Sequence, residues 1–234
     1  MILVALLGAG AGAAAVAGAQ RLGGGLALDA GAVKAYLARH PQVLIEAADA
    51  YRARGRSQAV GANRPAIVQP FGNAWAGNPR GDVTIVQYFD YNCGYCRRNL
   101  PVIDQLVAAD PNIRVVFREL PILSRESYAA AQLSLVAAQR GRFHQFHQAL
   151  YASGPISDAG IDGALQAAGI TPAEARKAAA TPAIEAELSR NLAMVDKLDL
   201  RGTPSWVVGD EVISSALTLD QLRELVAEAR AKRG

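Results

Sequence analysis

The two cysteines of this 234-residue chain constrain its fold more than any other feature, because they form a single C-x-x-C pair. Cys93 and Cys96 follow an apolar, β-branched and aromatic run over 83–89 that predicts a buried strand. They open a segment with helical spacing over 93–109. Two residues between the thiols place the first at the exposed helix start and the second inward beneath it. The pattern predicts a nucleophilic thiolate at Cys93 and a resolving thiol at Cys96.

The residues between the cysteines, Gly94 and Tyr95, form the predicted active-site loop and add no positive charge. We therefore expect the helix terminus and its unpaired backbone N–H groups, rather than a neighbouring cation, to lower the pKa of Cys93.

A metal site is the main competing interpretation of the cysteine pair. Structural zinc takes four nitrogen or sulfur ligands, and His144 and His147 lie on one face of a predicted helix. Their distance from the cysteines in the sequence argues against a compact finger, so we expect both to be ordinary helix-surface or boundary residues. Arg97 stands where haem attachment requires histidine. We expect neither a metal nor a cofactor.

The first nineteen residues are uncharged and rich in Ala, Gly, Leu and Val. They end in Ala17-Gly18-Ala19, which is typical of a cleaved secretory signal, and we assign residues 1–19 to it. A retained membrane anchor is the alternative, but Gly and Ala contribute little transfer free energy to a spanning helix. Cleaved export is favoured, and it places the mature chain where disulfides persist.

Composition excludes some function classes. The formal net charge is +3 and no run of Lys or Arg is present, so a nucleic-acid partner is not expected. Hydrophobic residues make up 51% of the chain, enough for one substantial core and an additional element.

The segments before the cysteines predict a separate N-terminal part. A helical pattern runs from Val33 to about Arg54 with a break at His40-Pro41, and we assign 20–54 to a helical extension. Packing against the main domain and self-association as a stalk both fit this pattern. Residues 55–81 carry scattered Gly, Pro and Asn without a helical or strand period, which predicts a linker.

The remaining segment, 82–234, predicts an α/β domain. A strand, a helix and a second strand at 113–117 form a right-handed parallel crossover, and a helical insertion follows at about 122–199. Capped helix starts are predicted at Ser157, Thr171 and Thr181, with a capping box at Thr171. A hairpin over 206–214 and a last helix from Thr218 give the order β-α-β, insertion, β-β-α.

Thr203 and Pro204 form a second signal directly before the hairpin. An X-Pro bond at a strand start is a candidate for the cis isomer, and the residue before it can pair with an extended substrate segment. Thr-Pro alone is weak evidence for a cis-proline at a substrate-binding edge, but beside a C-x-x-C pair on this scaffold the evidence becomes strong.

The residues Phe89–Arg98, Gly202–Ser205 and Phe117–Leu123 resemble the DsbA family of periplasmic thioredoxin-fold proteins. Gly94-Tyr95, Thr203 and the helix before Pro41-Gln42-Val43 are most similar to the ScsC branch, named for suppression of copper sensitivity. The resemblance implies a thioredoxin fold, a Cys93–Cys96 redox pair, and a cis-proline at Pro204 with Thr203 shaping substrate contact.

The same resemblance implies partners. These are exported proteins with thiols or disulfides, a membrane redox partner of the DsbD or ScsB type, and further copies of the chain in a trimer formed through the N-terminal helices. Disulfide isomerisation or reduction is modestly favoured, and a monomeric DsbA-type dithiol oxidase remains the alternative. A third hypothesis is a copper-tolerance module, because paired thiolates suit Cu(I).

One position departs from the common pattern. Gln87 lies six residues before the first cysteine, where many thioredoxin-fold enzymes keep a buried acid, and an amide cannot accept a proton in the same way. Asp90 is the candidate substitute, and a cap on the active-site helix is the alternative role for its carboxylate.

Overall fold

The computed structural model describes residues 29–232, so the proposed signal over 1–19 lies outside the described part. The chain divides into two compact units, residues 1–51 and residues 52–234. Within residues 29–232, no helix combines the length and apolar character needed to cross a bilayer.

The described part of the first unit is helical. Helix α2 (Ala30–Arg39) begins at Asp29, whose carboxylate accepts a hydrogen bond of 2.9 Å from the N–H of Gly31. Helix α3 (Gln42–Val68) begins directly after Pro41 and continues into the second unit. Large apolar side chains of the first unit are exposed: Val33, Tyr36, Leu44, Ile45 and Tyr51.

The irregular linker expected over 55–81 is wrong for 55–68, where α3 continues to Val68, and for the short strand β1 at 75–77. Val60 and Ile67 on α3 are 1% and 0% exposed. Glycines inside a helix cost about 1 kcal/mol each, and burial of these two side chains offsets that cost. Packing therefore overrides the local Gly and Pro signals that suggested a linker.

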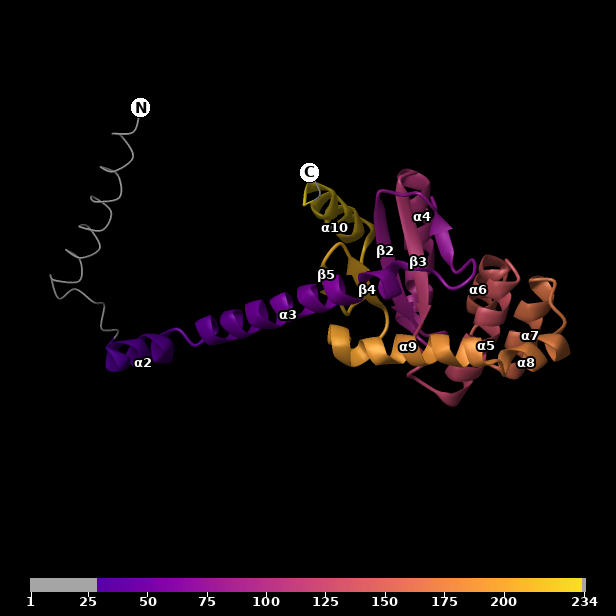
Figure 1. Ribbon diagram of the computed structural model, residues 1–234, viewed down its shortest axis with the longest axis horizontal. Helices are drawn as coiled ribbons and strands as arrows, with labels where there is room; N and C mark the ends of the chain where they lie inside the picture. Colours follow the sequence, from indigo (N-terminus) through magenta and orange to yellow (C-terminus); the bar gives the residue numbers. More distant parts are fainter. Residues whose placement is uncertain (1–28, 233–234) are drawn as a thin grey trace, which may run out of the picture. The chain divides into compact units, whose positions relative to one another are not determined.

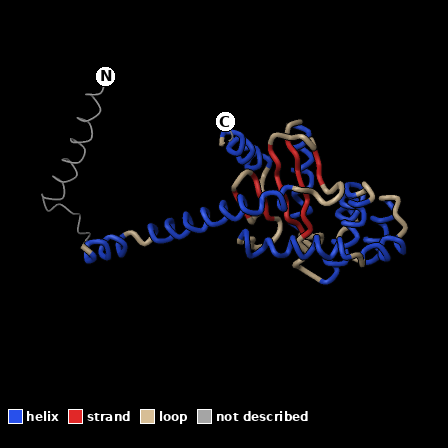
Figure 2. Tube along the Cα trace, in the orientation of Figure 1, coloured by secondary structure: helices blue, strands red, loops and turns tan. Residues whose placement is uncertain are grey.

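The second unit contains a five-stranded sheet in the order β1-β3-β2-β4-β5 (Figures 1 and 2). Strands β2 and β3 are parallel, and their register runs from Val83 opposite Ile113 to Phe89 opposite Glu119. The other pairs are antiparallel. The strands are β1 (Trp75–Gly77), β2 (Val83–Phe89), β3 (Ile113–Glu119), β4 (Ser205–Val208) and β5 (Glu211–Ile213).

Helices connect and cover the strands in the predicted thioredoxin order. Helix α4 (Gly94–Ala109) makes the crossover from β2 to β3, the helical insertion lies between β3 and β4, and α10 (Leu219–Ala231) closes the chain. The fold is therefore α/β with a β-α-β unit, a helical insertion and a β-β-α unit, as expected. The insertion comprises α5 (Arg125–Gln139), α6 (Phe143–Ala152), α7 (Asp158–Ala167), α8 (Pro172–Ala179) and α9 (Pro182–Leu198).

Three of the predicted helix starts can be compared with their caps. Ser157 accepts a hydrogen bond of 3.1 Å from the N–H of Gly160, and Thr218 forms a full capping box with Gln221. The capping box expected at Thr171 is wrong, because its side chain makes no cap hydrogen bond.

The core occupies both faces of the sheet. Side chains alternate along β2, so Ile85 and Phe89 join the helices α4, α5, α6 and α10 on one face. Val86 and Tyr88 point to the other face, where they meet Val60 from α3 and residues of α9.

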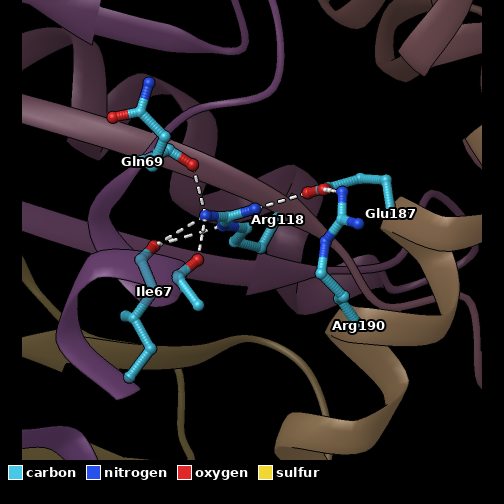
Figure 3. Close-up of polar contacts among 6 residues, drawn as sticks. Ile67, Gln69, Arg118, Glu187 and Arg190 are labelled. Atoms are coloured by element: carbon cyan, nitrogen blue, oxygen red, sulfur yellow. Dashed lines mark hydrogen bonds and ion pairs between the residues drawn. The ribbon is translucent and has the colours of Figure 1, made fainter. Parts of the chain in front are cut away.

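Arg118 on β3 joins α3 and α9 across this second face (Figure 3). Its guanidinium donates to the carbonyl oxygens of Ile67, at 3.1 Å, and of Ala66 and Gln69, and it forms an ion pair with Glu187. Arg118 and Glu187 are each only 4% exposed. The last carbonyls of a helix have no partner within the helix, so this arginine satisfies the end of α3.

Candidate active site

Cys93 lies at the N-cap of α4, between the end of β2 and the first helical turn. Its backbone is extended, with φ −83° and ψ 109°, and its sulfur accepts a hydrogen bond of 3.3 Å from the N–H of Cys96. The structure thus places the first cysteine at the mouth of the helix and the second inside the first turn, as the spacing predicted. Both cysteines are free thiols.

The Thr203–Pro204 segment meets the cysteine pair. In its protonated form, the thiol of Cys93 donates a hydrogen bond of 3.1 Å to the carbonyl oxygen of Thr203, and the Thr203–Pro204 peptide bond is cis, as expected. The two segments lie side by side because β4 pairs with β2, with Ser205 opposite Tyr88. The buried hydroxyl of Thr203 has no hydrogen-bond partner within the described part of the chain.

The two thiols have opposite electrostatic environments. The hydrogen bond from the Cys96 thiol is the main cause that lowers the pKa of Cys93 to about 6, and burial opposes it. Burial raises the pKa of Cys96 far above that of an ordinary thiol. At neutral pH the site therefore holds one thiolate and one neutral thiol.

The active-site loop residues are exposed on the first turn of α4. Tyr95 is 59% exposed, and the guanidinium carbon of Arg98 lies 4.3 Å from the centre of its ring. This is a cation–π contact. A cation therefore stands over the loop, although Gly94 and Tyr95 themselves carry no charge.

A buried polar layer lies behind the cysteines. The hydroxyl of Tyr91 is 2.9 Å from the Oγ of Ser134 and 2.9 Å from the Nδ1 of His147. His147 is 2% exposed, so its expected surface position is wrong. Burial lowers the pKa of His147 to about 3 and keeps it neutral, and the ring stacks on Phe143.

His144 contacts the chain elsewhere, since its Nε2 donates to the carbonyl oxygen of Trp75 at 2.6 Å. The Nδ1 of His147 and the Nε2 of His144 therefore bond to other groups and not to the cysteines. Over residues 29–232 there is no cluster of three or more His, Cys, Asp or Glu arranged to hold a metal ion.

The carboxylate of Asp90 does not cap the active-site helix, so that interpretation is wrong. Cys93 occupies the cap position, while Asp90 accepts hydrogen bonds from the loop that follows β3. Gln87 is buried on β2, opposite Phe117 and Trp206.

Glu119 is a buried acid that the sequence reasoning missed. It ends β3 opposite Phe89, is 2% exposed, and has one carboxyl oxygen without a hydrogen-bond partner in the described structure. Burial raises its pKa well above the usual range of a glutamate. The signal in the sequence was the charged pair Arg118-Glu119 at the end of an apolar strand.

The fold and the cysteine pair define the class of this chain: it is a thioredoxin-fold domain of the thiol–disulfide oxidoreductase type. Residues 84–227 match the family model of the DSBA-like thioredoxin domain, and the chain belongs to this family.

Several solved structures are similar to the chain, and two of them are compared with it. A thioredoxin-like oxidoreductase from Silicibacter pomeroyi is 39% identical, with a TM-score of 0.65, over 67% of this chain and 91% of the other. A linker-deletion variant of ScsC from Proteus mirabilis is 27% identical, with a TM-score of 0.72, over 86% of this chain and 92% of the other.

A curated relative is much longer than this chain. The Na(+)/H(+) antiporter NhaA 1 of Salinispora arenicola is 27% identical over 152 residues, which is 64% of this chain and 23% of the antiporter. The chain thus spans about a quarter of the length of that relative.

Proposed function

We propose that this chain is a periplasmic thiol–disulfide oxidoreductase that acts on exported proteins, with disulfide isomerisation or reduction as its main reaction. One observation carries the proposal: a Cys93 thiol with a pKa of about 6 stands at a helix start, in front of a protonated Cys96. Because a thiolate is the species that attacks a disulfide, this pair is ready to react at neutral pH.

In the first step, the Cys93 thiolate attacks one sulfur of a substrate disulfide. A mixed disulfide forms between Cys93 and the substrate, and the other substrate sulfur leaves as a thiolate. In isomerisation, that thiolate attacks another disulfide, and the final attack of a substrate thiolate on the mixed disulfide restores Cys93. In reduction, Cys96 loses its proton and attacks Cys93, which leaves an oxidised cysteine pair and a substrate reduced by two electrons.

The N-terminal helices support an oligomeric isomerase. The described part of the first unit exposes five large apolar side chains, which fits burial against other copies of the chain. We propose a homotrimer formed through 20–54. A variant that begins at Gly55 should become monomeric in light scattering and lose isomerase activity, while its dithiol chemistry persists. A monomeric full-length mature protein would contradict this part of the proposal.

A dithiol oxidase is the second candidate function, and the pKa of Cys93 favours it. Stabilising the thiolate stabilises the reduced pair, and this makes the oxidised pair a stronger oxidant of substrate thiols.

Two ribonuclease assays separate these functions. Recovery of activity from scrambled ribonuclease would support the isomerase, whereas oxidation of reduced ribonuclease without unscrambling would favour the oxidase. Cys93→Ser should abolish either activity, and Cys96→Ser should retain mixed-disulfide formation. Tight stoichiometric Cu(I) binding without either activity would favour the copper-tolerance module instead.

The proposal also covers how the chain is exported and what reduces its cysteine pair. The apolar segment 1–19 supports export by a cleaved signal, with a membrane anchor facing the periplasm as the alternative. An enzyme that reduces substrates must itself be reduced, and we propose a membrane partner of the DsbD or ScsB type. Accumulation of the oxidised pair in cells that lack such a partner would support this assignment.

A further inference from the structure

Asp90 is a buried carboxylate that forms no ion pair in the described part of the chain. It is 1% exposed and directly follows β2. Its Oδ1 accepts from the N–H of Asn92 at 2.7 Å and from the hydroxyl of Ser127 at 2.6 Å. Its Oδ2 accepts from the N–H groups of Ile122 and Leu123 at 2.9 and 3.0 Å. Four neutral donors thus compensate the loss of hydration of a buried charge.

The backbone of the same residue holds the cysteine. The carbonyl oxygen of Asp90 accepts from the N–H of Cys93 at 3.0 Å and from the hydroxyl of Tyr151 at 3.1 Å. Asp90 therefore connects the turn before Cys93, through its main chain, to the 122–123 segment, through its side chain.

The segment that Asp90 holds is apolar and exposed. Ile122 and Leu123 are 43% and 51% exposed. Within residues 52–232, they and Tyr95 are the large hydrophobic side chains that are exposed, and Tyr95 lies between the two cysteines. Asp90 bonds both the 122–123 segment and the turn before Cys93, and exposed apolar side chains near a reactive group mark a contact surface.

Resting on the proposed disulfide exchange, we propose that Asp90 is a positioning residue that fixes Ile122 and Leu123 beside Cys93, where they contact an apolar side chain adjoining the reacting cysteine of a substrate polypeptide. The hydrogen bonds explain why a carboxylate is needed. Each of its oxygens faces only donors, so the amide of Asp90→Asn can satisfy one side and must direct its own NH₂ group at donors on the other.

The experiment compares a peptide disulfide that has leucine beside its cysteine with a small aromatic disulfide that lacks a peptide. In Asp90→Asn, kcat/KM for the peptide should fall about tenfold more than the rate with the small disulfide, because a partly buried apolar contact is worth roughly that factor. The change should appear mainly in KM. Asp104→Asn makes the same chemical change at an exposed position of α4. It should leave the ratio of the two activities, peptide disulfide over small disulfide, at the wild-type value.

The double variant Ile122→Ser/Leu123→Ser serves as a second probe, because both side chains are exposed and their loss should not prevent folding. It should give the same fall in the ratio. Wild-type ratios in both variants would overturn the role of Asp90, while wild-type activity on the peptide would leave the proposed function intact. An inactive wild-type protein would overturn the proposed function and the positioning role together.

Discussion

The sulfur of Cys93 lies 3.1 Å from the carbonyl oxygen of Thr203, a residue 110 positions further along the chain. The pairing of β4 with β2 creates this contact, since it places the start of β4 beside the end of β2. The cysteine pair and the proposed substrate-contacting residue Thr203 thus come from two parts of the thioredoxin fold, with the helical insertion between them in the sequence.

The reactivity of Cys93 should depend on its hydrogen bond from Cys96. In the reduced protein, the rate of alkylation by iodoacetamide should rise with pH around a midpoint of about 6. Cys96→Ala removes the strongest stabilising contact, and a hydrogen bond to a charged group is worth about 1.5–3 kcal/mol, so the midpoint should rise by about one to two pH units.

The ultraviolet absorbance of the thiolate provides an independent titration for this prediction. Cys96→Ser retains a hydroxyl donor and should shift the midpoint less than Cys96→Ala does. Equal midpoints in the wild type and Cys96→Ala would assign the low pKa to Thr203 and the backbone N–H groups of the helix start instead.

The Arg118–Glu187 pair should be essential to stability. Arg118→Met leaves the Glu187 carboxylate and the carbonyls at the end of α3 without their buried partner, and breaking a buried ion pair costs about 3–5 kcal/mol. Denaturant unfolding should show a loss of this size, and backbone amides of the last turns of α3 should exchange faster with solvent.

Arg190→Ala is the matched control for this pair. Arg190 contacts the other oxygen of Glu187 at 2.7 Å but is 55% exposed, so its loss should cost less than about 1 kcal/mol. Similar losses in the two arginine variants would show that burial of Arg118 adds nothing.

The sequence predicts the order of the elements from β2 onward and the position of the cysteine pair at a helix start, since both depend on local patterns. Apolar runs define β2 and β3, and the spacing of Cys93 and Cys96 places the first at the helix cap and the second inside the first turn. The prediction of a linker failed because the burial of Val60 and Ile67 is a tertiary effect. The local sequence, which contains Gly61 and Pro65, does not indicate it.

The polar interior could not be predicted from spacing either. His147 lies on an amphipathic helix, and its contacts with Tyr91 and with Phe89 of β2 arise only when α6 packs against the sheet. Asp90 adjoins the cysteine in sequence, but its donors at 122 and 123 come from the end of another strand.

Glu119 should reduce stability at neutral pH. Its pKa is raised in the folded state, so the folded protein retains a proton that the unfolded chain releases as the pH rises above about 4.3. Its contribution is therefore most favourable at acid pH and is lost as the pH rises. Glu119→Gln should raise the free energy of unfolding at pH 7, and the gain should shrink toward pH 4. A variant less stable than the wild type at pH 7 would contradict this prediction.

His147 should destabilise the protein in acid, which is the opposite dependence. Its folded pKa of about 3 lies below the unfolded value of about 6.5, so the unfolded chain binds a proton first as the pH falls. Stability is full above pH 6.5 and declines toward pH 3. Between pH 6.5 and 5 the loss should be about 2 kcal/mol, because each unit is worth about 1.36 kcal/mol.

His147→Asn should lower stability overall but flatten this slope. Phe146→Leu, a neighbouring buried change without a titrating group, should lower stability and keep the slope. Parallel pH profiles for His147→Asn and the wild type would exclude His147 as the acid-sensitive group.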